Sequence, residues 1–294
     1  MFAGLLLMIG SEVGTLAHIE PFWSWNTPIA WTGFILFADA IVFSRRGDSW
    51  LRTSPQEFAF LSLVSIPLWL VFEFYNLFLH NWYYTGLPEN FALRMFGYAW
   101  SFSTIWPAIF EGAELVSVLR TGEAGRTGAP GNGGAELLPP RLSRPSRPSR
   151  PTLAALLLGA VLLIVPFVVS TSVAAYLAAP VWLGFIFLLD PVNARLGEPS
   201  LTGDFAAGRT DRLVNLVVSG FLCGFLWEFW NYWSRAKWHY TVPIMEHTKL
   251  FEMPLPGFLG FPAFALECFT MYVFLRLVVA GVTGSRQLGR TVAL

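Results

Sequence analysis

The sequence places acidic side chains inside stretches that are otherwise apolar. An ionised acid in the middle of a bilayer costs several kcal/mol, so each such residue must stay protonated, accept hydrogen bonds or hold a cation. The only base within these stretches is Arg276, near the end of the last one. The acids are Glu12, Asp39, Glu73, Glu111, Glu114, Asp190, Glu228 and Glu267.

Two of these acids are followed three residues later by an asparagine. Glu73 precedes Asn76, and Glu228 precedes Asn231. Residues three apart share one face of a helix. We expect the four groups to converge on one site, with the glutamates as catalytic acids and the asparagines orienting them or the substrate. The alternative is that each pair is only a hydrogen-bonded clamp between helices.

Further candidates surround these pairs. Glu111 and Glu267 follow prolines, which free a backbone carbonyl, and they are candidate acids for which catalysis and packing are both open. Aromatic residues at the ends of apolar segments are candidate substrate-binding groups, because their faces stabilise cations. These residues are Trp82, Tyr84, Trp238 and Tyr240.

Metal and cofactor sites are not expected. His239, His247 and Glu246 are the nearest approach to a ligand set, but they lack a ligand spacing such as His-x-x-x-His. The apolar stretches contain neither a lysine for a retinal Schiff base nor a histidine for haem. The formal net charge of +0 does not suggest a nucleic-acid partner.

The elements that carry these residues are apolar helices. Hydrophobic residues make up 54% of the chain and charged residues 13%, about half the charge of a soluble domain. The sequence therefore predicts an all-α integral membrane protein with about eight transmembrane helices. The expected spans are Phe2–Ala17, Pro28–Phe43, Phe58–Leu79, Tyr98–Leu119, Leu153–Val173, Pro180–Val192, Leu213–Trp233 and Phe258–Ala280.

Basic residues predict the orientation in the membrane. With alternating spans, all but four of the 19 Lys and Arg fall on one side. The four exceptions are Arg94, Arg235, Lys237 and Lys249. The positive-inside rule makes the arginine-rich side cytoplasmic, with the N-terminus outside and the C-terminus inside. The expected location is a bacterial cytoplasmic (inner) membrane.

The chain contains an internal repeat. The segment from Trp31 to Asp39 recurs from Trp182 to Asp190, and Phe72-Glu-Phe-Tyr-Asn76 recurs as Trp227-Glu-Phe-Trp-Asn231. Four spans per copy give both copies the same orientation, so the sequence predicts two parallel four-span repeats with a site at their interface. The expected divisions are a first repeat (1–119), a disordered basic cytoplasmic linker (120–151) and a second repeat (152–294).

The order of motifs in each copy resembles the membrane-embedded lycopene cyclases of the heterodimeric and fused type. The stretch from Met253 to Phe261 is similar to the family's Pro-Leu-Glu-Glu-Phe-Leu-Phe-Phe, although the paired glutamates are replaced by Pro256 and Gly257. The first copy has Phe96 and Gly97 in that region. The resemblance implies cofactor-independent acid catalysis on a long isoprenoid, here with a different acid.

Three functions remain open at this point. The leading one is a site that binds a membrane lipid or isoprenoid, or acts on it as a cyclase or isomerase. A cation- or proton-coupled secondary transporter would use the same carboxylates and amides as ligands. A structural subunit of a membrane complex would need no site at all.

Overall fold

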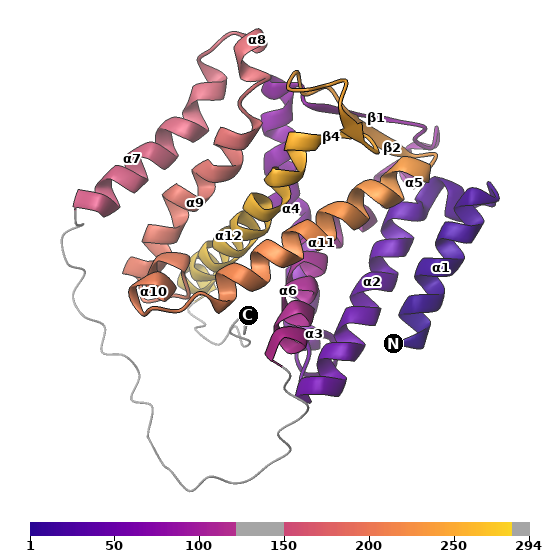
Figure 1. Ribbon diagram of the computed structural model, residues 1–294, viewed down its shortest axis with the longest axis horizontal. Helices are drawn as coiled ribbons and strands as arrows, with labels where there is room; N and C mark the ends of the chain where they lie inside the picture. Colours follow the sequence, from indigo (N-terminus) through magenta and orange to yellow (C-terminus); the bar gives the residue numbers. More distant parts are fainter. Residues whose placement is uncertain (122–149, 284–294) are drawn as a thin grey trace, which may run out of the picture.

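A computed structural model describes residues 1–121 and 150–283, and nearly all of this part of the chain outside the loops is α-helical (Figure 1). The expected linker, 120–151, lies almost wholly outside the described residues. In the first half the elements are α1 (Phe2–Leu16), α2 (Phe22–Arg46), α3 (Trp50–Thr53), α4 (Pro55–Leu79), β1 (Trp82–Thr85), α5 (Phe91–Ser103) and α6 (Ile105–Thr121).

The second half follows a similar order. Its elements are α7 (Arg150–Ile164), the 3-10 turn η1 (Val165–Phe167), α8 (Thr171–Ala174), α9 (Ala178–Arg195), α10 (Leu201–Ala206), α11 (Asp211–Trp233), β2 (Lys237–Tyr240), β3 (Lys249–Leu250), β4 (Met253–Pro254), the 3-10 turn η2 (Leu255–Leu259) and α12 (Gly260–Thr283).

Five segments of the described chain are long and apolar enough to cross a membrane, so the protein is a polytopic integral membrane protein. They are Phe22–Arg46, Pro55–Leu79, Phe91–Arg120, Asp211–Trp233 and Leu255–Val282. The helices Phe2–Leu16 and Thr152–Phe167 are apolar but shorter. Six of the expected spans each correspond to one helix, whereas Tyr98–Leu119 is divided between α5 and α6 and Leu153–Val173 is divided among α7, η1 and α8. Eight complete crossings stay a prediction.

Glycines allow close helix pairs in both halves. A Cβ atom on Gly4 of α1 would lie 2.5 Å from the carbonyl oxygen of Gly33 in α2. A Cβ atom on Gly159 of α7 would lie 2.8 Å from the carbonyl oxygen of Gly184 in α9. Small residues bring the backbones of membrane helices into direct contact, and van der Waals packing then stabilises the pair.

The two halves interlock through polar contacts to backbone carbonyls. The Asn26 side chain on α2 donates a 3.2 Å hydrogen bond to the Trp230 carbonyl on α11. The Tyr75 hydroxyl on α4 donates a 3.1 Å hydrogen bond to the Leu163 carbonyl on α7. Helix α11 of the second half is thus held against α2 of the first half, and α4 of the first half is held against α7 of the second half.

A two-stranded ribbon joins the halves at one end of the bundle, in a described chain that is otherwise nearly all-α, as predicted. Strands β1 and β2 are antiparallel, and Trp82 pairs with Tyr240, Tyr83 with His239 and Tyr84 with Trp238. A second short ribbon, β3–β4, follows. The aromatic segments were expected as substrate-binding groups at the ends of apolar segments and not as strands, because a single sequence does not show that two distant strands will pair.

The opposite end of the bundle carries the short helices α3 and α10 (Figure 1). Asp39 accepts a 2.9 Å hydrogen bond from the Leu51 backbone N–H of α3. Asp190 accepts a 2.7 Å hydrogen bond from the Leu201 backbone N–H of α10. These acids therefore satisfy free N–H groups at helix starts, where negative charge is stabilising.

Candidate functional site

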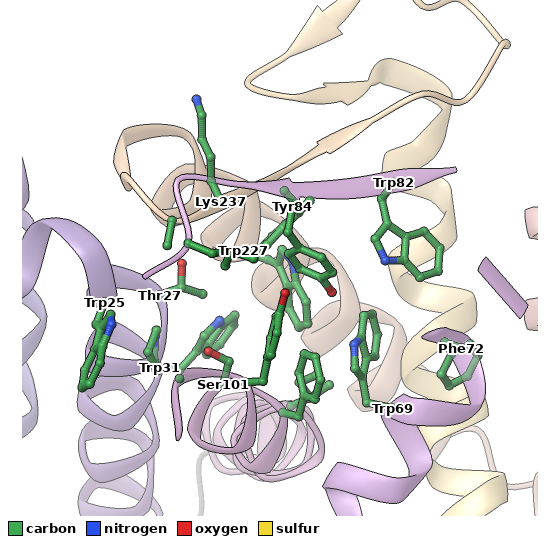
Figure 2. Close-up of a pocket in the computed structure, with 18 of the residues that line it drawn as sticks. Trp25, Thr27, Trp31, Trp69, Phe72, Trp82, Tyr84, Ser101, Trp227 and Lys237 are labelled. Atoms are coloured by element: carbon green, nitrogen blue, oxygen red, sulfur yellow. The ribbon is translucent and has the colours of Figure 1, made fainter. Parts of the chain in front are cut away.

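An aromatic cavity lies beneath the β1–β2 ribbon, between the two halves (Figure 2). The cavity volume is about 120 Å³. On the same measure one water molecule needs about 10–15 Å³, so the cavity has room for much more than a single water. Its walls include helices α2, α4, α5, α6, α9, α11 and α12, both strands of the ribbon and β4. The cavity therefore has the place expected for a shared site, at the interface of the halves.

Tryptophan dominates the cavity walls. Several of these tryptophans stand at matched positions in the two halves, such as Trp31 with Trp182 and Trp82 with Trp238. Aromatic rings supply large apolar surfaces and negative faces, which suit hydrocarbon chains and cations. The tryptophans that line the cavity are Trp25, Trp31, Trp69, Trp82, Trp182, Trp227 and Trp238.

Glu73 lies behind this aromatic wall and accepts three hydrogen bonds on a single oxygen. Its Oε1 receives the Trp69 indole N–H at 2.9 Å, the Trp82 indole N–H at 3.2 Å and the Tyr84 hydroxyl at 2.5 Å. Three donors directed at one oxygen match the charge of an ionised carboxylate. Of this group, Trp69, Trp82 and Tyr84 line the cavity.

Glu228 occupies the matching place in the second half with fewer donors. Its Oε1 accepts the Tyr240 hydroxyl at 2.9 Å, and that hydroxyl accepts the Trp238 indole N–H at 2.9 Å. The residue is fully buried, and its Oε2 has no hydrogen-bond partner among residues 1–121 and 150–283. The two glutamates thus meet different surroundings although their sequence motifs match.

Tyr84 and Tyr240 connect the two carboxylates to the cavity, because each tyrosine lines the cavity and is hydrogen-bonded to its glutamate. Burial and the neighbouring Glu73 raise the pKa of Tyr84 well above its ordinary value of 10.0. Burial and the neighbouring Glu228 raise the pKa of Tyr240 in the same way. Both hydroxyls therefore stay protonated at physiological pH and donate their O–H groups to the glutamates behind the wall.

The asparagines do not line the cavity. Asn231 accepts the Trp238 backbone N–H at 3.0 Å and donates to the Trp238 carbonyl at 2.9 Å. Asn76 binds the Trp82 backbone in the same two-point manner, at 3.2 Å and 2.8 Å. Each asparagine therefore clamps one ribbon strand to the end of its own helix and positions the aromatic side chains indirectly.

Glu111 and Glu267 lie away from the cavity, in the buried interior of α6 and α12. Glu111 follows Pro107 by four residues and Glu267 follows Pro262 by five, so the two are not at equivalent helical positions. Neither carboxylate oxygen of Glu267 has a hydrogen-bond partner within the described chain. The structure does not bring this pair to the Glu73 and Glu228 groups.

The histidines take part in surface contacts. His239 Nδ1 lies 3.0 Å from Glu252 and its Nε2 lies 3.1 Å from the Thr85 hydroxyl, so both ring nitrogens are engaged. His247 pairs with Glu246 at 3.3 Å, and both side chains are exposed. Throughout the described ranges, no three His, Cys, Asp or Glu residues gather in a way that could hold a metal ion.

Several lining residues were not singled out from sequence. Trp31 and Trp227 stand within the repeated motifs, so their recurrence was a usable signal. Thr27, Trp69 and Arg94 carry no such signal, because only the packing of α2, α4 and α5 brings them to one cavity.

No protein-family model matches the chain, and neither a curated protein nor a solved structure is significantly similar to it. The function must therefore be argued from the cavity itself.

Proposed function

We propose that the protein binds an isoprenoid or a similar lipid chain in the aromatic cavity and acts on it by acid–base chemistry. The observation that carries this proposal is the contact of two glutamate–tyrosine pairs with one tryptophan-lined cavity. A long hydrocarbon is the ligand class that gains most from burial against such walls.

The two pairs suit opposite roles. Glu73, with three donors on one oxygen, serves as the base. Glu228, buried with one unpaired oxygen among the described residues, holds the proton and serves as the acid. Tyr240 relays it: its hydroxyl turns from Glu228 to the substrate, gives up its own proton and takes the Glu228 proton in its place. Unequal surroundings of two titratable groups separate their roles in this way.

The resulting reaction needs no cofactor. A proton added to a carbon–carbon double bond gives a carbocation, which the tryptophan faces stabilise by cation–π contact. Loss of a proton from a neighbouring carbon to the base completes a cyclisation or isomerisation without oxidation or reduction. This is the chemistry that the resemblance to lycopene cyclases implies, with Glu228 and Glu73 as the acid and the base.

The proposal includes the symmetry of the chain. The two halves are two parallel four-span repeats, with the cavity on the axis between them and the arginine-rich end in the cytoplasm of a bacterial cell. In support, the glycine contacts of α1–α2 and α7–α9 correspond, Asp39 and Asp190 receive equivalent hydrogen bonds, and the ribbon register exchanges matched residues.

Deuterium uptake tests the acid–base role directly. Lipids that copurify with the protein are identified by mass spectrometry, and the complex is then incubated in D₂O. We expect one isoprenoid class to be enriched and to acquire carbon-bound deuterium. Glu73→Gln and Glu228→Gln should stop the uptake, because glutamine keeps an acceptor oxygen but carries no exchangeable acid proton.

Glu198→Gln, an exposed change at the other end of the bundle, is the matched control and should exchange as the unmodified protein does. Copurification of bulk phospholipids alone, in the proportions of the membrane, would contradict lipid selection by the cavity. Normal uptake in both active-site variants would contradict the acid–base assignment.

A further inference from the structure

Two buried hydrogen-bond donors of the cavity wall have no partner in the part of the chain that the structure describes. The Thr27 hydroxyl and the Trp31 indole N–H both belong to cavity-lining residues of α2, and both are unpaired within the described ranges. Thr27 is 7% exposed and Trp31 2% exposed. Buried polar groups are nearly always hydrogen-bonded, so two on one wall call for an explanation.

The local backbone explains why Thr27 does not satisfy itself. A threonine within a helix commonly donates to the carbonyl four residues earlier, as Thr32 does to Pro28 at 2.7 Å. For Thr27 that carbonyl belongs to Trp23, which instead accepts the Arg235 backbone N–H at 2.8 Å. The helix is also non-helical at Trp25, between the two positions. The Thr27 hydroxyl is thereby left for another acceptor.

The two donors act together because they are four residues apart on one helix face. Figure 2 shows Thr27 and Trp31 on the same side of the cavity, whereas the labelled Lys237 side chain extends away from it. An indole N–H can only donate, and the Thr27 hydroxyl can donate beside it. This wall therefore suits an acceptor oxygen on a ligand.

A third donor lines the same cavity. Arg94, near the start of α5, lies over the Phe91 ring, and its guanidinium has no ion pair or side-chain hydrogen bond among the described residues. Its charge would add to the donors if the acceptor were anionic.

We propose that the ligand of the cavity is an oxygen-bearing amphiphile, whose carbonyl or carboxylate oxygen accepts hydrogen bonds from Thr27 and Trp31. This inference rests on the proposed lipid-binding function and narrows it, since an oxygen-free hydrocarbon would leave both donors buried and unpaired. The second half has Ala178 at the position of Thr27. The oxygen-bearing end therefore lies on the α2 side, and the ligand binds in one direction.

The test compares three probes with one C20 isoprenoid skeleton: phytane, phytyl acetate and phytanic acid. Binding is measured as radiolabelled probe retained by the protein in nanodiscs over empty nanodiscs. We expect phytyl acetate or phytanic acid to bind at least about tenfold more tightly than phytane. Thr27→Val and Trp31→Phe should each weaken the preferred probe about fivefold and leave phytane unchanged.

Thr270→Val is the matched control, because the Thr270 hydroxyl is satisfied within its own helix by the Leu266 carbonyl at 2.9 Å, away from the cavity. Thr27→Ser keeps the hydroxyl and should bind as the unmodified protein does. If Trp31→Phe does not fold, the comparison of Thr27→Val with Thr27→Ser is sufficient to test the proposal. Arg94→Gln separates the two sources of the oxygen: it should weaken phytanic acid alone if the natural head is anionic, and neither probe if the head is a neutral carbonyl.

Two outcomes remain distinct. Equal binding of all three probes, unaffected by Thr27→Val and Trp31→Phe, would overturn the acceptor-oxygen inference and leave the lipid-binding function standing. Failure of all three probes to bind would overturn the proposed function itself.

Discussion

At the residue scale, the spacing of Glu and Asn was informative, but it did not reveal what each side chain binds. Glu73 and Asn76 were expected to meet at one site because they share a helix face. Glu73 does contact the cavity wall, whereas Asn76 binds the strand that follows its helix. Helical periodicity predicts which residues share a face, but the path of the chain beyond the helix end decides what a side chain there contacts.

The clamp made by Asn231 gives a stability prediction. Asn231→Ala removes two hydrogen bonds to the Trp238 backbone and leaves these partly buried groups without their side-chain partner, so we expect a loss of about 1–3 kcal/mol in the free energy of unfolding. Asn231→Asp keeps the acceptor and should lose less. Thermal unfolding in detergent measures both, and an unchanged melting temperature in Asn231→Ala would contradict the clamp.

The Glu252 carboxylate gives a pH prediction. Burial by itself would raise its pKa, but hydrogen bonds from Lys237 and His239 lower it below the ordinary 4.5. A lowered pKa means that the stabilising contribution is present above pH 4.5 and is lost as the pH falls through the folded-state value. We expect Glu252→Gln to melt at a lower temperature than the unmodified protein at pH 7.

That difference in melting temperature should shrink only in acid. A difference that stays constant down to pH 3 would show that Glu252 stabilises β2 by packing and not by charge.

At the element scale, helix positions followed from hydrophobicity, but the ribbon and helix breaks did not. The span expected at Tyr98–Leu119 is two helices, α5 and α6, separated at Thr104. Apolar composition extends across this break, so composition could not show it. The close contact of α1 with α2 at their glycines could not be predicted either. In the sequence, a glycine that allows close packing cannot be told from one that merely occurs in an apolar segment.

Two glycines of α1 give a matched prediction. Gly4→Ala places a Cβ atom 2.5 Å from the Gly33 carbonyl oxygen, so the α1–α2 pair must separate. We expect a loss of about 1–3 kcal/mol from overpacking, seen as a melting temperature lower by several degrees. A Cβ atom on Gly10 meets no described residue within 4 Å, and Gly10→Ala should be neutral or stabilising. Equal behaviour of the two variants would contradict the close contact.

At the scale of the whole molecule, the membrane character was readable from sequence because it depends on composition, whereas the arrangement of the two halves as parallel repeats stays a prediction. The separation of charges is also visible in the structure. Arg46, Arg120 and Arg212 lie toward the α3–α10 end, whereas Lys237 and Lys249 belong to the ribbons at the other end (Figure 1). The cavity could not be outlined from sequence, because its walls come from segments that only the packed bundle brings together.

Orientation in the membrane is tested with a membrane-impermeant maleimide. Cys223 and Cys268 are buried and should not react, so single cysteines report their own location. We expect Glu89→Cys, next to the ribbon, to be labelled on intact spheroplasts. Glu198→Cys, at the α10 end, should be labelled only after permeabilisation, because the positive-inside rule predicts that the arginine-rich end faces the cytoplasm. The reverse pattern would invert the topology.

The register of the β1–β2 ribbon has a consequence for ancestry. Trp82 faces Tyr240 while Tyr84 faces Trp238, so exchanging the two strands gives the same set of pairs. Two identical copies of a Trp-Tyr-Tyr strand could therefore form such a ribbon with each other. A single ancestral half could have formed the roof of the cavity as a homodimer, and joining two copies in one gene would have freed each side to diverge. Once the two copies are separate segments of one chain, the surroundings of Glu73 and Glu228 can differ.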